Sequence, residues 1–403
     1  MEKIELSKEK TALRAVAAVM FLLIGVGALT YAVSQFFSTE PGWQTIQAGT
    51  SGGPTCGDEF VLLYEVGASG RSARKEGQDL NELYTQACRT AFQLFHTEMS
   101  FEGVVNLKEI NDRPNEALEV DPALYRAFEA VREAGDRNVY LGPVYARYGD
   151  VFFCTDDVQL ADFDPRSSEA VRREYEAVAA YARNPQAVEL CLLGDNQVCL
   201  KVSEEYLAFA RQEGIERFLD FGWLKNAFVV DCLGDLMVEN GYTHGSISSY
   251  DGFTRNLDDR GLDYAQNIYD YVDGAVRPAG VMEYRGPMAL AYLRDYPIND
   301  LDGQRIYRLK NGERRTSYLS PEDGRCQSAV SGLLCYSDTA GCGEMALELA
   351  PIYVAETLDV PALEALAGRG IQSVRCEDGV IRGTDPGLSL SSLYEGDGGA
   401  PVG

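Results

Sequence analysis

Histidine is scarce in this sequence, and several common catalytic motifs are missing. Only His96 and His244 occur among 403 residues, which excludes a histidine-rich metal site. Neither histidine stands in a motif that pairs it with a nucleophilic serine or cysteine, and we expect a structural role for His244. The sequence contains no P-loop, no Cys-x-x-Cys pair and no internal repeat. These absences argue against nucleoside triphosphatases and against hydrolases with a catalytic triad.

Basic residues are also few. The chain has 36 Lys and Arg against 62 Asp and Glu, a net charge of −26, so the phosphates of nucleic acids and anionic membrane surfaces are repelled. Solubility is the simplest explanation of this acidic balance. Charged residues make up 24% and hydrophobic residues 45% of the chain, which is ordinary for a globular protein. The length allows one membrane segment with one large or two small domains.

A long apolar run lies near the N-terminus. Ala15–Val33 carries no charge and is close to the length that spans a bilayer, and basic residues precede it. We therefore expect an uncleaved anchor with a cytoplasmic N-terminus. A cleaved signal peptide is the alternative, although Ser34–Phe37 is not a small-x-small cleavage site. The organisation we predict is a cytoplasmic N-terminus over 1–11, a transmembrane anchor over 12–37, a flexible linker over 38–58, one domain over 59–384 and a disordered tail over 385–403.

Ten cysteines permit disulfides if the domain is exported. Cys191 and Cys199 flank the turn signal Gly194-Asp195-Asn196, which lies between two apolar runs. A three-residue loop would place the two cysteines opposite each other on one face. A cross-strand disulfide and a pair of buried thiols both remain open.

The stretch Asp220–Gly252 predicts a turn, a helix and a strand that ends in a turn. Apolar residues recur at helical spacing after the turn, and Asn240-Gly241 is a helix stop. The segment that follows alternates like a strand and ends in a glycine-containing turn. Because a helix N-terminus presents unpaired N–H groups to phosphate, this arrangement is typical of a nucleotide-binding corner.

Other elements follow from periodicity and capping signals. We expect one long helix whose buried face runs from Leu80 to Phe95, and further helices that begin at Asp121-Pro122, Asp164-Pro165 and Ser203. The remaining expected elements are strands at Phe60–Val66, Ala279–Tyr284, Ala289–Leu293, Arg305–Leu309 and Ser328–Tyr336, helices near 341–358 and 361–368, and a final hairpin that turns at Glu377-Asp378-Gly379.

The stretch resembles a segment of the ApbE-type flavin transferases, which reads D-x-G-G-I-A-K-G-Y-x-x-D. Asp220 and Asp231 fall at the two aspartates, and Gly222 matches the first glycine. Trp223 and Asn226 replace the second glycine and the lysine. The resemblance implies an α+β domain that uses FAD and Mg²⁺ to move FMN onto a Ser or Thr of an exported redox protein. The cofactor-binding residues it implies are Asp220, Gly222, Lys225, Asn226, Asp231, Asp251, Gly252, Ser317 and Pro321.

The resemblance also places a metal site. The family holds a divalent metal with an Asp and a Thr four residues apart on a helix, and Glu344 and Glu348 take these positions. Two carboxylates on one helix face suit a hard cation, but a solvated acidic helix face is the more common explanation of such a pair. An ion pair between Lys225 and one of these carboxylates is a further alternative. The family's aromatic region corresponds to Tyr140–Tyr145, where rings either stack on a flavin or belong to the core.

Two functions are therefore compatible with the sequence. The first is a membrane-anchored, extracytoplasmic FAD:protein FMN transferase. The second is a divergent member without transfer activity that binds flavin or protein. The substitutions that favour it are those at Trp223, Asn226, Ser317, Ser320, Glu344 and Glu348. An anchored assembly subunit with no ligand is a third possibility.

We expect the N-terminal anchor to remain in the mature protein, because the apolar run is long and basic residues precede it. Intact mass spectrometry of the mature protein measures this directly. An N-terminus that begins after Phe37 would show that the segment is cleaved.

Overall fold

The computed structural model describes residues 40–299, 301–302, 305–377 and 379–391. The predicted cytoplasmic segment and anchor lie outside these residues. Within the described ranges, no helix is both long enough and apolar enough to cross a bilayer.

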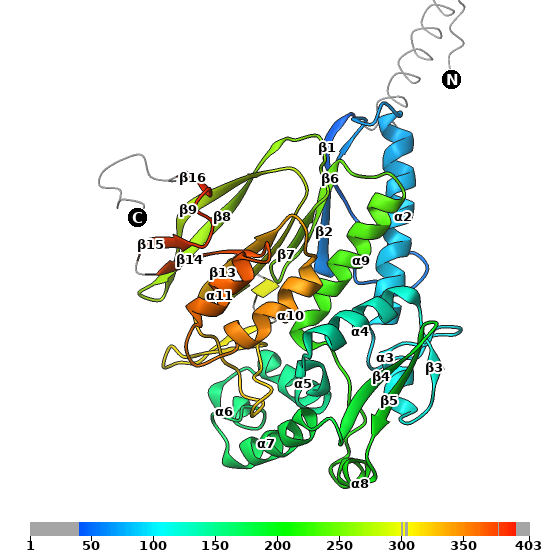
Figure 1. Cartoon of the computed structure of the whole chain (residues 1–403), viewed down its shortest axis with the longest axis vertical. Helices are drawn as coiled ribbons and strands as arrows, with labels where there is room; N and C mark the ends of the chain where they lie inside the picture. Colours follow the sequence, from blue (N-terminus) through cyan, green and yellow to red (C-terminus); the bar gives the residue numbers. More distant parts are fainter. Residues whose placement is uncertain (1–39, 300, 303–304, 378, 392–403) are drawn as a thin grey trace, which may run out of the picture.

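An antiparallel sheet of eight strands forms the centre of the molecule (Figure 1), in the order β1-β2-β6-β7-β10-β13-β14-β15. Every pairing in it is antiparallel, as an α+β fold requires. The strands are β1 (Gly42–Ile46), β2 (Phe60–Val66), β6 (Gly245–Ser249), β7 (Phe253–Asn256), β10 (Met288–Arg294), β13 (Gly332–Ser337), β14 (Gln372–Glu377) and β15 (Val380–Gly383).

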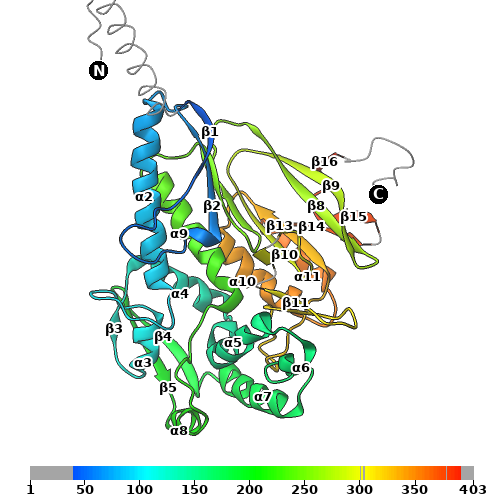
Figure 2. The ribbon, with the colours of Figure 1, turned by 180° about the vertical axis from the view of Figure 1, so that it is seen from behind.

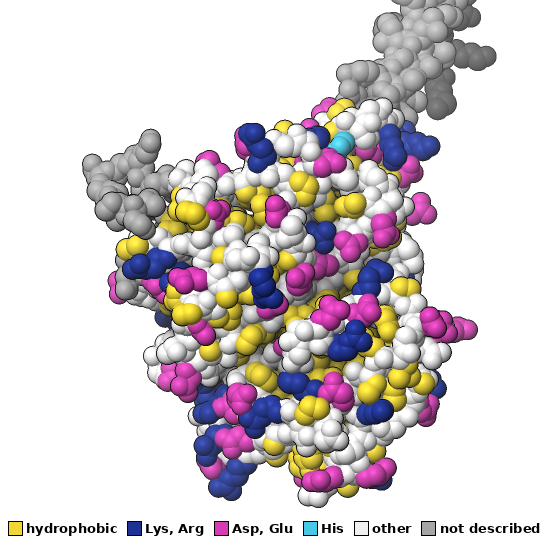
Figure 3. All heavy atoms as spheres, in the orientation of Figure 1, with side chains coloured by type: hydrophobic (Ala, Val, Ile, Leu, Met, Phe, Trp, Pro, Cys, Tyr) yellow, Lys and Arg dark blue, Asp and Glu magenta, His cyan; other side chains and the backbone are white. Residues whose placement is uncertain are grey.

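Helices cover one face of this sheet and a small sheet covers part of the other (Figure 1, Figure 2). The covering helices are α2 (Ala73–Leu94), α9 (Lys225–Glu239), α10 (Cys342–Tyr353) and α11 (Val360–Ala367). The small sheet consists of β16 (Ser389–Ser391), β9 (Ala275–Arg285) and β8 (Asp263–Val272). On the face shown in Figure 3, acidic and basic side chains are interspersed over the helices.

The central strands are buried on both faces because each face has its own cover. In β10, Ala291 and Leu293 pack under the helices, whereas Leu290 and Tyr292 pack against the small sheet. Side chains alternate between the faces of a strand, so a strand covered on both sides reads as a continuous apolar run. The sequence MALAYLR of β10 is such a run.

A group of shorter elements extends below the sheet in Figure 1 and supplies the walls of the site described below. These elements are α3 (Leu107–Asp112), β3 (Leu118–Glu119), α4 (Pro122–Ala134), α5 (Gly142–Tyr148), α6 (Asp157–Leu160), α7 (Glu169–Arg183), β4 (Val188–Gly194), β5 (Gln197–Val202) and α8 (Glu204–Glu213). Short 3-10 turns and two further strands complete the described fold: η2 (Gly57–Glu59), η3 (Asn138–Tyr140), η4 (Gly149–Phe153), η5 (Gly222–Leu224), β11 (Ile306–Arg308) and β12 (Arg314–Thr316).

Local signals predicted many of these elements correctly. The strand predicted at Phe60–Val66 is β2, and the Asp121 side chain caps α4 by accepting from Ala123 N–H. Ser203 caps α8 in the same way, and Gly214 ends that helix in the left-handed conformation. Cys191 and Cys199 are direct partners in the β4–β5 hairpin, as expected, and both are free thiols. The turn between them uses two left-handed residues, Asp195 and Asn196.

Three predictions were wrong. The helix expected at Asp164-Pro165 begins at Glu169 with Ser168 as its cap, because the buried Asp164 carboxylate pairs with Arg315. The linker predicted over 38–58 contains β1, which pairs along β2, and the tail predicted from residue 385 contains β16, which pairs with β9. Backbone hydrogen bonds to a neighbouring strand order both segments despite their polar composition.

A buried carboxylate fixes the connection between β7 and β8. Asp258 is fully buried and accepts hydrogen bonds from Arg260 and from the Tyr264 hydroxyl, and Arg260 also pairs with Glu65 on β2. Burial alone would raise the pKa of Asp258, but the hydrogen bonds from Arg260 and Tyr264 outweigh it and lower the pKa to about 2. The ionised carboxylate therefore stabilises the folded state.

We expect Asp258→Asn to lower the free energy of unfolding by about 2 kcal/mol at neutral pH. A carboxyl group with a lowered pKa stabilises the fold above its unfolded pKa, and that contribution is lost as the pH falls. The difference from wild type should thus shrink as the pH falls from about 4 to about 2. Urea denaturation at several pH values measures it, with the exposed Asp259→Asn as control, and equal effects of the two substitutions would contradict the argument.

Candidate active site

The turn before α9 depends on a glycine. Gly222 has φ +54°, and a Cβ built on it would lie 2.4 Å from the ring of Tyr145. Left-handed backbone and this close ring leave no room for another residue. The Asp220 carboxylate accepts from Gly222 N–H at 2.8 Å and pairs with Arg217 at 3.1 Å, which holds the turn in place. Burial raises the pKa of Asp220, and Arg217 opposes the shift.

A cavity of about 400 Å³ opens against this turn. It lies at the N-terminal end of α9, between α2 and α5, and aromatic rings make up much of its wall. These are the rings of Phe92, Phe95, Tyr145, Tyr148, Phe152 and Trp223. The structure brings together six of the nine residues for which we expected cofactor binding: Asp220, Gly222, Lys225, Asn226, Asp251 and Ser317.

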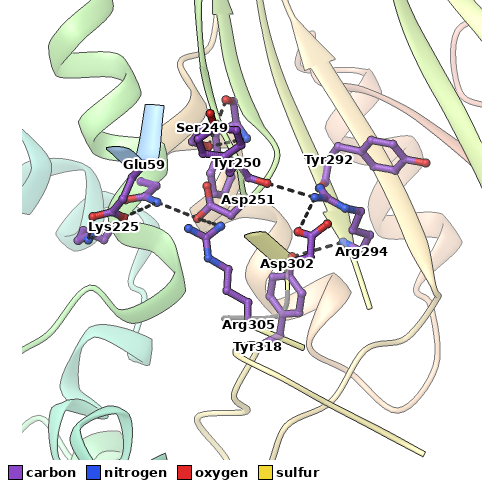
Figure 4. A network of polar contacts seen from close by, with 12 residues as sticks. Glu59, Lys225, Ser249, Tyr250, Asp251, Tyr292, Arg294, Asp302, Arg305 and Tyr318 are labelled. Atoms are coloured by element: carbon purple, nitrogen blue, oxygen red, sulfur yellow. Dashed lines mark hydrogen bonds and ion pairs between the residues drawn. The ribbon is translucent and has the colours of Figure 1, made fainter. Parts of the chain in front are cut away.

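A network of charged groups lines one wall of the cavity (Figure 4). Lys225 Nζ lies 3.1 Å from a carboxylate oxygen of Glu59. The Asn226 amide donates to Glu59 and to Asp251, each at 3.1 Å. Arg305 pairs with Asp251 at 2.9 Å. The network therefore joins η2, the start of α9, the turn between β6 and β7, and the segment before β11.

The network affects two pKa values. Burial opposes ionisation of Glu59, but Lys225 and Asn226 outweigh it, so the pKa of Glu59 is lowered. Burial lowers the pKa of Arg305, and the charge of Glu59 opposes that shift. Sequence reasoning did not identify Glu59 or Arg305, because neither belongs to a motif and both reach the cavity through tertiary contacts.

A second ion pair holds the turn that carries Asp251. Arg294 and Asp302 are almost fully buried and pair at 2.8 Å, and Arg294 also donates to the Tyr250 carbonyl at 3.1 Å (Figure 4). Gly252, which follows Asp251, has φ +108°, and a Cβ on it would lie 2.3 Å from the carbonyl oxygen of Tyr292. Gly252, expected to bind cofactor, thus sets the conformation of this turn and does not line the cavity.

Several buried polar atoms at the cavity have no hydrogen-bond partner among the described residues. They are Trp223 Nε1, Asn226 Oδ1, Asp251 Oδ1 and the hydroxyl group of Tyr145. A buried polar group without a partner costs about 1–3 kcal/mol, so this clustering needs a reason. A ligand with both donors and acceptors would satisfy these atoms.

Asp231 has a different role from the one expected. Its carboxylate accepts from the backbone N–H groups of Cys342 at 3.0 Å and Gly343 at 2.8 Å, and pairs with Arg255 at 2.8 Å. It thereby caps α10, whose own N-cap residue, Gly341, has no side chain to do so. Burial raises the pKa of Asp231, and Arg255 opposes the shift.

Pro321 also lies away from the cavity lining, in a turn closed by a hydrogen bond from Gly324 N–H to the Ser320 carbonyl. The aromatic region is divided. Tyr145 lines the cavity, whereas the Tyr140 hydroxyl accepts from Leu190 N–H within the core.

The expected metal ligands do not form a metal site. Glu344 is exposed, and Glu348 pairs with Arg369 at 2.6 Å. Neither lines the cavity, and Lys225 pairs with Glu59 rather than with either of them. Across the described residues, no three Asp, Glu, His or Cys side chains converge in a way that would hold a cation. These residues therefore do not fit the divalent metal that the resemblance implied.

Comparison with known proteins identifies the fold. No family model and no curated protein matches the sequence. Solved structures do match: the ApbE protein from Thermotoga maritima has a TM-score of 0.55 and 15% identity over 87% of this chain and 97% of that chain. The flavin transferase ApbE from Vibrio cholerae has a TM-score of 0.57 and 16% identity over 88% and 97%, respectively. The expected fold is thus confirmed, although the sequences are only 15–16% identical.

We expect Asp231→Ala to lower the free energy of unfolding by about 3 kcal/mol, because it removes a cap and leaves Arg255 with a weaker partner. Asp235→Ala is the matched control, since Asp235 also pairs with Arg255 but is half-exposed. It should change stability by no more than about 0.5 kcal/mol. Urea denaturation compares the two variants, and a mild effect at Asp231 would refute the capping role.

Proposed function

We propose that this chain is a flavin-binding protein built on the flavin transferase fold, and that FMN transfer by it is weak or absent. The observation that carries the proposal is the cluster of unpartnered polar atoms on the aromatic wall of the cavity. An isoalloxazine ring is flat and apolar on its faces and carries donors and acceptors at its edge. Trp223 Nε1 offers a donor and Asn226 Oδ1 offers an acceptor to such an edge.

The size and rigidity of the cavity support this assignment. Small-molecule sites commonly occupy about 300–1,000 Å³ and are mostly apolar with a few fixed polar groups. This cavity, at about 400 Å³, has that character. Trp223 is held edge-to-face against Tyr318, with ring centroids 5.1 Å apart, so its N–H has a fixed direction.

Transfer of FMN requires more than a flavin site. A divalent metal in such a reaction neutralises the pyrophosphate and stabilises charge on the transferred phosphoryl group. Glu344 and Glu348 are not placed to hold one at this cavity, as described above. The cavity wall offers two cations, Lys225 and Arg305, and both already pair with carboxylates. Among the described residues, therefore, no unpaired Lys or Arg at the cavity replaces the charge that a metal would supply.

The runner-up is an active FAD:protein FMN transferase that modifies a Ser or Thr of an exported redox protein. The shared fold favours it, as do the six expected residues that line the cavity. For either function we place the domain outside the cytoplasm, on the anchor over 12–37, with a protein partner on the same side of the membrane. The apolar run and the basic residues before it support this placement.

Titration of the purified full chain with riboflavin and with FAD, with and without Mg²⁺, tests flavin binding. We expect binding without Mg²⁺, and we expect Tyr145→Phe to weaken it by about five- to tenfold because one hydrogen bond is lost. Tyr206→Phe is the matched control, since the Tyr206 hydroxyl is also buried and unpartnered but lies away from the cavity. No binding of either flavin, or equal effects of the two substitutions, would refute the proposal.

Transfer is tested separately. The full chain is incubated with FAD, Mg²⁺ and an acceptor domain that a known flavin transferase modifies, and in-gel flavin fluorescence detects covalent product. We expect little or none, because no cluster of metal ligands lies at the cavity in the part of the chain that the structure describes. Robust flavinylation would show that the runner-up function is correct.

A further inference from the structure

We propose that Cys56 and Cys88 form a disulfide that clamps the wall of the cavity. The Cys56 thiol donates to the Cys88 carbonyl at 3.1 Å, and Cys56 N–H approaches the same oxygen at 3.4 Å. The Cys88 side chain is also the neighbour that most strongly raises the pKa of Cys56. Cys88 lies on α2 and is fully buried, and Cys56 is 5% exposed. The two side chains are therefore already adjacent before any bond forms.

The pair is connected directly to the charged network of the site. Cys56 lines the cavity and precedes η2, and Glu59 N–H donates to the Cys56 carbonyl at 2.9 Å. Glu59 in turn holds Lys225 and Asn226. A bond from Cys56 to α2 would thus fix η2, the turn that positions the Glu59 carboxylate.

The segment before Cys56 has few other attachments. Residues 49–54 are mostly exposed and rich in glycine. Side-chain hydrogen bonds tie this region to α2 at three places, from Asn81 to the Gln47 carbonyl at 2.6 Å, from Gly49 N–H to Thr85 at 2.8 Å and from Arg89 to the Ser51 carbonyl at 2.9 Å. A covalent bond from Cys56 to Cys88 would add an attachment to α2 between these contacts and β2, and so shorten the unattached segment before β2.

The chemistry is ordinary thiol–disulfide exchange with a low-molecular-weight disulfide such as oxidised glutathione as the oxidant. One cysteine thiolate attacks the oxidant and releases one thiol, and the second cysteine then displaces the other thiol from the mixed disulfide. Two S–H bonds are lost, one S–S bond forms, and the two protons and two electrons leave with the reduced oxidant. Contact with Cys88 and burial raise the pKa of Cys56, so exchange is slow in the folded chain and fastest before Cys56 is buried.

The structure contains a control pair. Cys191 and Cys199 are cross-strand partners in the β4–β5 hairpin, and neither lines the cavity. A disulfide there would not touch the site. Cys191→Ser removes that possibility at a half-buried position and leaves Cys199 in place.

The test uses the full chain carrying Cys191→Ser, refolded in reduced or in oxidised glutathione. Peptide mapping after thiol alkylation should find Cys56 cross-linked to Cys88 only in the oxidised sample. The oxidised chain should melt about 3–6 °C higher, because the bond closes a loop between residues 32 apart. Cys56→Ser should abolish both differences. Full alkylation of both thiols after oxidising refolding, or a cross-link without a rise in melting temperature, would overturn the clamp.

The effect on the site rests on the proposed function and is measured separately by riboflavin titration. The oxidised chain should bind riboflavin about threefold more tightly, because the wall is organised in advance. Equal affinity in the two states would overturn the coupling to the cavity. Absence of binding in both states would refute the proposed function itself, while the peptide map and melting temperature still decide whether the disulfide exists.

Discussion

The hydrogen bonds of one buried amide hold the site together. Asn226 donates to Glu59 and to Asp251, so the first turn of α9 is tied both to η2, just before β2, and to the turn between β6 and β7. The balancing positive charge comes from Lys225, which pairs with Glu59, and from Arg305, which pairs with Asp251. If the amide were lost, the carboxylates of Glu59 and Asp251 would have no shared donor and would repel each other. The two segments of the cavity wall that carry them would then move apart.

The sequence predicted those parts of the fold that depend on local signals. Caps such as Asp121 and Ser203, the glycine stop after α9 and the alternating pattern of β2 each require only a few neighbouring residues. Of the hairpin of β8 and β9, the sequence predicted only the second strand. The first, β8, is polar on much of its surface, and only Ile268 in it is deeply buried. Its pairing with β9, rather than its own pattern, determines that it is a strand.

The site was predictable to the extent that it lies within one stretch. The turn and the start of α9 come from that stretch, so Asp220, Gly222, Lys225 and Asn226 were identified together. Asp231 stands in the same motif, yet its position one and a half turns along the helix directs it to α10 instead. Glu59 and Arg305 come from far away in the chain, and their charges meet there only in the folded state. No pattern in a single sequence contains that information.

The contact of Gly222 with Tyr145 has a consequence for how such a site changes over time. The Tyr145 ring occupies the space that a side chain at position 222 would need. A larger residue at 222 is tolerated only after Tyr145 has been replaced by a smaller side chain. Conversely, a smaller residue at 145 leaves a void that a side chain at 222 would fill. The two positions are therefore bound to vary as a pair among homologues. A sequence in which only residue 222 has become larger has a steric clash in the turn. A sequence in which only residue 145 has become smaller has a void in the cavity wall that a ligand would contact.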